Sequence, residues 1–394
     1  MTTETREGRA LLNALALLAI VALTGSLGLL LLVLGQRPAA AESPPAFLTK
    51  WGSVGSGDGQ FNLPRDVAVD TAGNVYVADT SNDRIQKFSG SGSFLTKWGS
   101  SGTGDGQFDI PFGLAVDSVG NVYVAENSNH RIQKFSSTGT FLTKWGSVGT
   151  GDGQFLNPRS VAVDSAGNVY VSDLGNDRIQ KFSSTGTFLT KWGSTGTGDG
   201  QFSDPMGIAV DSAGNVYVVD MLNDRIQKFG STGSFLAKWG SQGTGDGQFN
   251  NPVRVAVDSA GNVYVADSEN HRIQKFSSTG SFLTKWGSLG AGDGEFSAPQ
   301  GIALDSAGNV YVADTENHRI QKFGSAAPTP TPAPTVTPSP IAVGGIVDLI
   351  TAPDAPPAAS EPSQDGAALA VPLGLAAMLA LGAAGLYAVR MRRD

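Results

Sequence analysis

Cysteine is absent from this 394-residue sequence, which excludes disulfide bonds and a cysteine nucleophile. The fold must therefore be held together by its apolar core. Positive charge is also scarce, with 27 Lys and Arg against 35 Asp and Glu, and this balance argues against a nucleic-acid partner. No Gly-x-Ser-x-Gly elbow and no phosphate-binding Gly-Lys motif occur. We therefore predict no catalytic residue and no cofactor.

A sequence repeat fills most of the chain. The motifs Phe-Leu-Thr-Lys-Trp-Gly and Gly-Asp-Gly-Gln-Phe recur with small changes, and the Trp residues lie 47 residues apart, at Trp51, Trp98, Trp145, Trp192, Trp239 and Trp286. Each copy continues through a Pro, an Ala-Val-Asp run, a Gly-Asn-Val-Tyr-Val run and an Arg-Ile-Gln-Lys-Phe run. A fixed period of this size indicates a propeller or a solenoid.

One repeat has the pattern of four short strands. Residues 113–117 form a short apolar run, typical of a strand buried on both faces, and 122–125 are β-branched and aromatic. A Gly-containing turn separates these two runs. Residues 131–135 and 141–145 are the third and fourth strands, joined by a second turn. Four antiparallel strands per repeat predict an all-β propeller blade.

The core of each repeat resembles the NHL repeat. The resemblance rests on Asn-His-Arg-Ile at 129–132, 270–273 and 317–320, and on the versions with Asp83, Asp177 and Asp224 in place of His. It covers all six copies and implies a six-bladed β-propeller. It says little about function, because NHL propellers include RNA binders, protein scaffolds and receptor ectodomains, and related propellers include enzymes.

The number of strands predicts how the ring closes. Six sets of the first three strands run from residue 65 to 323, but the first copy of the fourth strand, residues 47–51, precedes every blade. The last blade, 301–323, has no fourth strand of its own. We therefore expect residues 47–51 to complete the last blade and to close a propeller domain that spans residues 46–325.

Both ends of the chain carry apolar segments. Residues 1–41 contain an apolar run at 11–34 and suit either a transmembrane segment or a cleaved signal peptide. Residues 326–366 are rich in Pro and Thr and predict an extended, disordered stalk, although the apolar patch 341–350 has no explanation. Residues 367–389 predict a transmembrane helix, and the basic tail 390–394 predicts a cytoplasmic C-terminus. We expect a cell-membrane protein with an extracytoplasmic propeller.

The repeated polar residues predict structural roles. The three His residues occupy equivalent repeat positions, so they would be spread around a ring, which is poor geometry for a metal site. One Asp per Gly-rich loop does not match a calcium-binding loop and favours loop stabilisation. The Arg of each Asn-x-Arg is expected to pair with a nearby acid of its own blade. We predict no metal site.

The copies differ from one another mainly where loops reach one face of the disc, called here the variable face. After the Pro of each repeat, one position per blade forms our predicted ligand-binding set: Arg65, Phe112, Arg159, Met206, Arg254 and Gln300. The three arginines would make the channel mouth locally positive. Selection for a ligand site and drift in tolerant loops both explain this variation, and both explanations remain open.

These observations favour a cell-surface, monomeric propeller that binds or scaffolds an extracellular protein, peptide or glycan without catalysis. The alternative is a propeller enzyme similar to lactonases or amidating lyases, which hold a metal in the channel with inequivalent His, Asp or Glu residues. The channel-side repeats here supply mostly Ala, Val and Ile. Contact with the membrane is expected through the terminal segments only.

Overall fold

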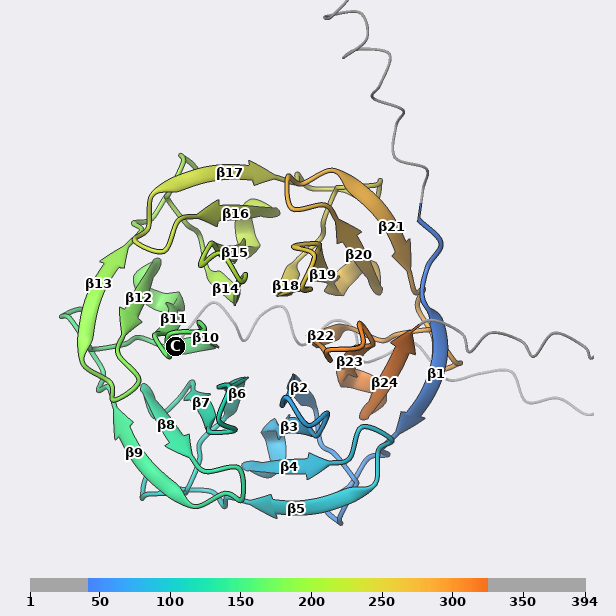
Figure 1. The fold of residues 1–394 in the computed structure, drawn as a ribbon, viewed down its shortest axis with the longest axis horizontal. Helices are drawn as coiled ribbons and strands as arrows, with labels where there is room; N and C mark the ends of the chain where they lie inside the picture. The colour runs from blue at the N-terminus through green and yellow to red at the C-terminus, as the bar shows by residue number, and fades with distance from the viewer. Residues whose placement is uncertain (1–41, 325–394) are drawn as a thin grey trace, which may run out of the picture. The chain divides into compact units, whose positions relative to one another are not determined.

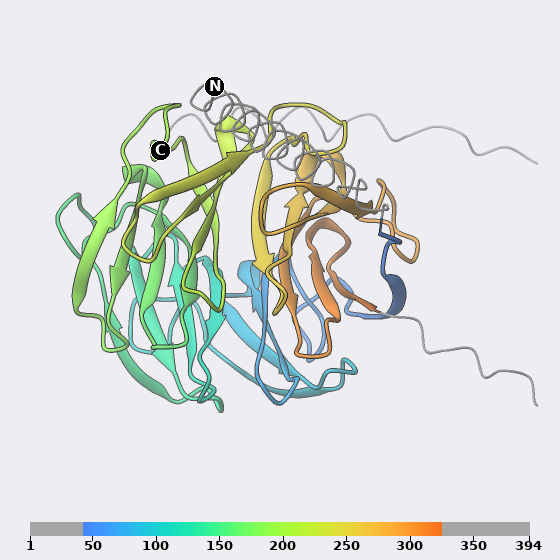
Figure 2. The same cartoon turned by 45° about the horizontal axis from the view of Figure 1, so that its top comes forward.

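A computed structural model describes residues 42–324, which form a ring of six four-stranded antiparallel sheets. Figure 1 looks down the axis of this ring, and Figure 2 shows its blades from an oblique angle. The predicted transmembrane segments, the stalk and the basic tail lie outside the described residues. Within 42–324, no helix is long and apolar enough to span a bilayer.

The innermost strand of every blade begins at the Pro of the repeat. These strands are β2 (Pro64–Val69), β6 (Pro111–Val116), β10 (Pro158–Val163), β14 (Pro205–Val210), β18 (Pro252–Val257) and β22 (Pro299–Leu304). The second strands are β3 (Val75–Asp79), β7 (Val122–Glu126), β11 (Val169–Asp173), β15 (Val216–Asp220), β19 (Val263–Asp267) and β23 (Val310–Asp314). The second strands are buried along their whole length, which explains why they consist mainly of Val, Ala and Tyr and end in a single acidic residue.

The third strands carry the Arg-Ile-Gln-Lys-Phe run. They are β4 (Arg84–Phe88), β8 (Arg131–Phe135), β12 (Arg178–Phe182), β16 (Arg225–Phe229), β20 (Arg272–Phe276) and β24 (Arg319–Gly324). The outermost strands are β5 (Phe94–Trp98), β9 (Phe141–Trp145), β13 (Phe188–Trp192), β17 (Phe235–Trp239), β21 (Phe282–Trp286) and β1 (Ala46–Trp51). Short 3₁₀ helices join the second and third strands: η1 (Thr80–Asn82), η2 (Leu174–Asn176), η3 (Met221–Asn223), η4 (Ser268–Asn270) and η5 (Thr315–Asn317).

The first strand closes the ring, as the strand count predicts. Blade 1 comprises β2–β5, blade 2 β6–β9, blade 3 β10–β13, blade 4 β14–β17 and blade 5 β18–β21, whereas blade 6 comprises β22–β24 and β1. In Figure 1 the blue strand β1 lies beside the orange strand β24. Their antiparallel register pairs Ala46 with Gly324 and Trp51 with Ile320. The two ends of the described chain therefore meet at one edge of the ring.

The core lies between neighbouring blades, because each sheet packs face to face on the next. Trp98 of blade 1 contacts Tyr76 of its own blade and Phe135 of blade 2, with ring centroids 6.2 Å and 5.9 Å away. Trp51 makes the same contacts between blade 6 and blade 1, to Tyr311 and Phe88. The repeated Trp is thus the aromatic link between consecutive blades, including the pair at the closure.

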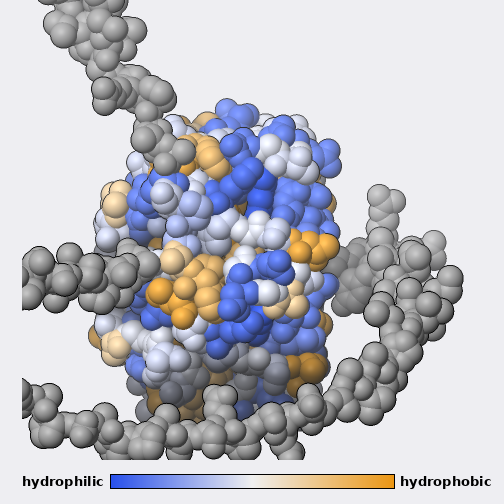
Figure 3. Space-filling view, turned by 90° about the vertical axis from the view of Figure 1, so that its right-hand side faces the viewer, coloured by the Kyte–Doolittle hydropathy of each residue, from blue (hydrophilic) through white to orange (hydrophobic). Residues whose placement is uncertain are grey.

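The ring has two distinct faces. The variable face carries the Gly-rich loops, the connections between second and third strands and the starts of the innermost strands, because Pro64 lies opposite Asp79 in the register. The opposite, invariant face carries the Asp-Ser-Ala-Gly-Asn and Ser-Ser-Thr-Gly hairpin turns. Along the rim near β1, apolar patches are scattered among polar side chains and form no continuous surface (Figure 3).

Candidate binding site at the mouth of the channel

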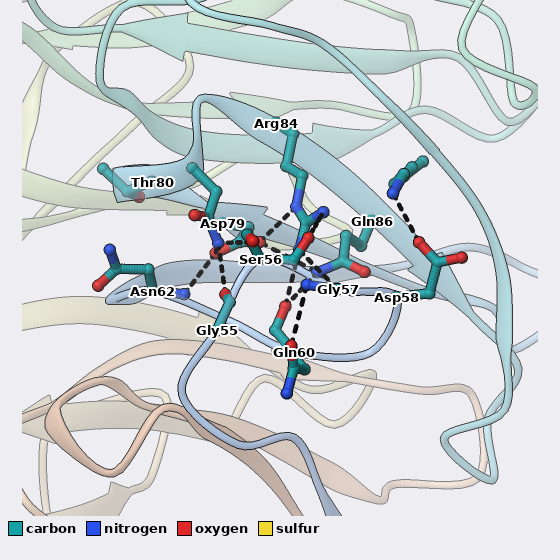
Figure 4. Close-up of polar contacts among 12 residues, drawn as sticks. Gly55, Ser56, Gly57, Asp58, Gln60, Asn62, Asp79, Thr80, Arg84 and Gln86 are labelled. Atoms are coloured by element: carbon teal, nitrogen blue, oxygen red, sulfur yellow. Dashed lines mark hydrogen bonds and ion pairs between the residues drawn. The ribbon is translucent and has the colours of Figure 1, made fainter.

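A buried side-chain network holds the Gly-rich loop of the variable face in each blade. In blade 1, Arg84 Nε donates to Asp79 Oδ2 at 2.6 Å, and the other guanidinium nitrogens donate to the carbonyls of Ser56, Gly57 and Gln60 (Figure 4). Gln86 Nε2 donates to the same Gln60 carbonyl and to Asp79. The predicted pairing of the repeat Arg with an acid of its own blade is confirmed.

Blade 2 has Glu126 in the place of this Asp. Glu126 accepts hydrogen bonds from Arg131 Nε at 2.6 Å, Asn129 Nδ2 at 2.6 Å and Gln133 Nε2 at 2.7 Å. Burial raises the pKa of Glu126, and these hydrogen bonds oppose that shift. The longer side chain therefore keeps the network of the other five blades.

The position that alternates between His and Asp connects each blade to the next. His130 Nδ1 accepts a hydrogen bond from the backbone N–H of Asn157 in the following blade at 3.0 Å, and Asp83 Oδ1 accepts the equivalent bond from Ile110 at 3.1 Å. Each donor lies in the left-handed region, with φ near +50°. Since His and Asp both supply an acceptor at this point, their alternation reflects a structural hydrogen bond.

The Asp residues of the Gly-rich loops form ion pairs at the outer rim. Lys97 Nζ lies 2.7 Å from Asp58 Oδ1, and both side chains are about half exposed. Exposed pairs of this kind contribute little to stability. Among the described residues, no group of three or more His, Asp or Glu side chains is arranged to hold a metal ion.

The predicted ligand-binding positions come together at the axis of the ring. Seven side chains meet at the channel mouth, namely Arg65, Phe112, Arg159, Met206, Val253, Arg254 and Gln300. All six residues predicted from the sequence belong to this set. Val253 was missed, because the sequence of blade 5 reads Pro-Val-Arg and places its Arg one position later than in blades 1 and 3.

Three of these side chains are buried. Phe112, Met206 and Arg254 are only 5%, 7% and 6% exposed. They fill the channel, whereas Arg65, Arg159 and Gln300 remain partly accessible. Half of the predicted set is thus buried, because the six innermost strands converge closely at the axis.

Arg254 forms an ion pair across the channel. Its Nε donates to Asp66 Oδ1 at 2.9 Å, and a second guanidinium nitrogen contacts Asp66 Oδ2. Asp66 Oδ2 also accepts a hydrogen bond from the backbone N–H of Leu114 at 2.6 Å. Replacement of Arg254 by Ala would leave a buried carboxylate without its partner, so this residue is part of the fold as well as of the mouth.

The third positions of the innermost strands alternate around the axis between glycine and larger residues. Blades 2, 4 and 6 carry Gly, whereas blades 1, 3 and 5 carry a side chain, in the order Asp66, Gly113, Ser160, Gly207, Arg254 and Gly301. A Cβ on Gly207 would lie 2.7 Å from Arg254 Cα. The glycines are required where a strand approaches the backbone of its neighbour.

Two arginines stack on one aromatic ring at the mouth. The guanidinium carbons of Arg65 and Arg159 lie 4.9 Å and 4.3 Å from the ring centroid of Phe112. Arg65 donates to Gln300 Oε1 at 3.2 Å. Burial, followed by the charge of Arg65, lowers the pKa of Arg159 to about 10, and Asp204 opposes this shift. Arg159 therefore remains charged at neutral pH.

Comparison with protein-family models matches the NHL repeat at residues 61–88, 108–135, 155–182, 249–276 and 296–323. Each matched stretch covers the first three strands of one blade. The chain is an NHL-repeat β-propeller. The resemblance inferred from the Asn-x-Arg-Ile motifs is thereby confirmed. The chain matches none of the curated proteins with which it was compared.

Solved structures with a similar fold share little sequence with this NHL propeller. A protein of unknown function from Bacteroides thetaiotaomicron is 20% identical, with a TM-score of 0.54 over 70% of this chain and 76% of the other. A streptogramin B lyase is 17% identical, with a TM-score of 0.48 over 66% and 78%. A virginiamycin B lyase from Staphylococcus aureus is 13% identical, with a TM-score of 0.46 over 66% and 80%. These likenesses concern the fold alone.

Proposed function

We propose that this NHL propeller is a non-catalytic binding module whose ligand, an extracellular protein, peptide or glycan, docks on the variable face at the channel mouth. The observation that supports the proposal is the contrast between mouth and framework. The network of an acidic residue, an Arg and a Gln recurs in all six blades, whereas the seven mouth residues include four residue types besides Arg. A uniform scaffold with one asymmetric centre suits recognition of a single ligand.

The geometry of closure supports an orientation for this module. Ala46 lies opposite Gly324 on the invariant face, so the described chain enters and leaves the ring at one place. If the terminal apolar segments anchor the protein in the cell membrane, as the sequence predicts, the invariant face lies toward the bilayer. The variable face then points outward, where an extracytoplasmic ligand can reach it.

A screen on arrays tests the proposed binding role. The full chain, solubilised in mild detergent, is probed against peptide and glycan arrays, and each hit is measured again with two variants. Arg159→Ala removes a mouth side chain, and we expect it to weaken binding by at least about 1 kcal/mol. Thr138→Ala changes an exposed turn of the invariant face and should leave affinity unchanged. Hits that depend on Thr138 and ignore Arg159 would contradict the proposed face.

The enzyme alternative predicts a different result in a simple measurement. A metal ion bound only to the folded state would stabilise it, so chelation would lower the melting temperature. We expect EDTA to leave the melting temperature of the full chain unchanged. A fall of many degrees, restored by a stoichiometric divalent metal, would favour a propeller enzyme with a channel metal.

A further inference from the structure

We propose that the Asp–Gly bond in each Gly-rich loop is a latent site of isoaspartate formation, and that the buried Gln of the third strand suppresses this reaction. The six bonds follow Asp58, Asp105, Asp152, Asp199, Asp246 and Asp293. Glycine after Asp favours the reaction, because no side chain hinders attack by its backbone nitrogen. All six loops belong to the variable face, so the modification would alter that surface.

The reaction needs only water and the two residues. The backbone nitrogen of Gly59 attacks Cγ of Asp58, a new N–Cγ bond forms, the amide proton passes to solvent, and the protonated carboxyl group loses its hydroxyl as water. A second water then opens the resulting succinimide ring. Cleavage of the new bond restores Asp, whereas cleavage between the nitrogen and the original carbonyl carbon leaves an isoaspartyl residue. One water is released and one is consumed, and the backbone gains one carbon.

The loop requires this labile pair because Gly59 adopts a left-handed backbone conformation. Its φ is +74°, and the equivalent glycines of the other blades have φ between +75° and +80°. A Cβ on Gly59 would meet nothing closer than Phe88 Cε1 at 3.9 Å, so backbone conformation rather than space selects glycine. Asp58 is about half exposed, so water reaches its carboxyl group.

A buried acceptor holds the attacking nitrogen in every blade. The N–H of Gly59 donates to Gln86 Oε1 at 3.0 Å, and the equivalent distances in the other blades are 2.9–3.0 Å. Gln86 is fully buried, and its Nε2 donates to Gln60 O and Asp79 Oδ2, which fixes Oε1 on the side of Gly59 (Figure 4). Attack removes the proton from this nitrogen, so a buried acceptor would lose its donor. The ring closure is therefore unfavourable while the loop stays folded.

The loop also holds the carboxyl group, but less firmly. Lys97 Nζ lies 2.7 Å from Asp58 Oδ1, and both side chains are about half exposed. Exposed pairs of this kind contribute little to stability. We therefore assign the suppression to Gln86 and its equivalents.

Isomerisation would disturb the network that positions the loop. Arg84 binds the carbonyls of Ser56 and Gly57, which precede Asp58, and the carbonyl of Gln60, which follows it. An extra backbone carbon between these carbonyls changes their spacing, so one guanidinium could no longer reach all three in the same geometry. The modification would thus change the shape of the variable face.

The test follows isoaspartate in the full chain, kept folded in mild detergent at neutral pH and physiological temperature. Each loop lies in a tryptic peptide of different sequence, such as 51–65 for blade 1 and 145–159 for blade 3, so fragmentation mass spectrometry locates every isoaspartyl residue. The same chain unfolded in guanidinium chloride is the reference. We expect isoaspartate in the six loops to accumulate at least about tenfold more slowly in the folded chain, because only the open fraction of each loop reacts.

Three variants of blade 1 separate the acceptor from other restraints. Gln86→Met keeps the length of the side chain but removes Oε1, so isoaspartate at Asp58 should accumulate several-fold faster while the other five loops stay unchanged. Gln60→Ala removes a different hydrogen bond of the loop, and Lys97→Ala removes the exposed ion pair. Both should change the rate at Asp58 by less than about twofold, since exposed contacts of this kind contribute little.

Four results would overturn the role of Gln86. Equal rates in the folded and the unfolded chain would show that the fold gives no protection. An unchanged rate at Asp58 in Gln86→Met would exclude the acceptor, and an equal rise at all six loops of that variant would assign the effect to unfolding of the ring. A rise in Gln60→Ala or Lys97→Ala as large as in Gln86→Met would assign it to general mobility of the loop.

Discussion

At the scale of single residues, one buried arginine per blade organises the loops of the variable face. Arg178 donates to Asp173 at 2.7 Å and to the carbonyls of Thr150, Gly151 and Gln154 at 2.7–2.8 Å. Removing Arg178 would take the cationic partner from the fully buried carboxylate of Asp173 and one hydrogen-bond donor from each of the three carbonyls.

We therefore expect Arg178→Ala to lower the free energy of unfolding by about 3–5 kcal/mol, because an unpaired buried charge is strongly unfavourable. The matched control is Lys191→Ala, whose ion pair with Asp152 is about half exposed and should contribute less than about 1 kcal/mol. Urea denaturation measures both variants. Similar losses in the two variants would contradict the assigned role of the network.

A second residue, Asp204, makes stability depend on pH. Burial, followed by the charge of Asp177, raises the pKa of Asp204 above its usual value of 3.8. Its carboxylate is thus less favourable in the folded than in the unfolded protein at neutral pH, and this cost disappears as the pH falls through the folded pKa to below 3.8. Asn157 and Asn251 occupy the equivalent left-handed positions of blades 3 and 5.

Asp204→Asn should therefore be more stable than the parent at pH 7, by less than about 1 kcal/mol because solvent screens a partly exposed group. The difference should shrink toward pH 4. Thermal unfolding across this range measures it. An advantage of the variant that grows as the pH falls would contradict the sign of the pKa shift.

The sequence predicts much of this residue scale because most contacts are repeated and local. Asp79 and Arg84 are five positions apart in one blade, so six copies of the motif reveal the pair. The contact between Asp66 and Arg254 spans 188 positions and occurs once, so the repeat pattern does not predict it. The burial of Phe112 and Met206 likewise depends on how six strands converge at the axis, which no single repeat specifies.

At the scale of elements, the alternation of glycine with larger residues from blade to blade around the axis sets the spacing of the innermost strands. A Cβ on Gly207 would approach the backbone of β18, at Arg254 Cα and Val253 O, within 2.7–2.8 Å. Backbone atoms on the neighbouring blade cannot move without shifting that blade.

We expect Gly207→Ala to destabilise the propeller by about 1–3 kcal/mol or more, since overpacking a close contact forces backbone movement. Gly230→Ser in the same blade is the control. Ser277 occupies the equivalent turn of blade 5, where its Oγ accepts a hydrogen bond from Ser281 N at 3.1 Å, so the variant should be neutral or stabilising. Chemical denaturation compares the two, and a tolerated Gly207→Ala would contradict the steric requirement.

The strand β1 offers a second test at this scale. Thr49 lies opposite Lys322 across the closure, just as Thr96 lies opposite Lys87 within blade 1. Because the natural chain contains no Cys, two designed pairs can be compared without competing thiols. Thr49→Cys with Lys322→Cys links distant parts of the chain, whereas Lys87→Cys with Thr96→Cys links one hairpin.

Oxidation should raise the melting temperature more for the closure pair than for the hairpin pair, since a crosslink over a longer loop restricts the unfolded chain more. Each oxidised protein is compared with its own reduced form, which cancels the effects of the substitutions themselves. A hairpin pair that gains as much as the closure pair would show that opening of β1 does not limit stability.

At the scale of the whole molecule, the period of 47 residues and the displaced copy of the outermost strand predict the ring and its closure. These features are countable along the chain. The distribution of side chains and glycines around the axis cannot be read from the repeat in this way, because it depends on which residues of different blades meet. Asp66, Ser160 and Arg254 carry side chains between three glycines only because six strand starts share one small space.

The pairing of Ala46 with Gly324 also determines how the ring responds to mechanical load. The chain enters β1 and leaves β24 at the same end of an antiparallel pair, so tension between these two points opens the pairs from Ala46–Gly324 to Trp51–Ile320 one after another. Such unzipping requires less force than shearing all pairs at once. Single-molecule pulling between residues 46 and 324 should therefore detach β1 at low force before any blade unfolds. If both ends of the propeller were tethered to one surface, no tension would act between β1 and β24.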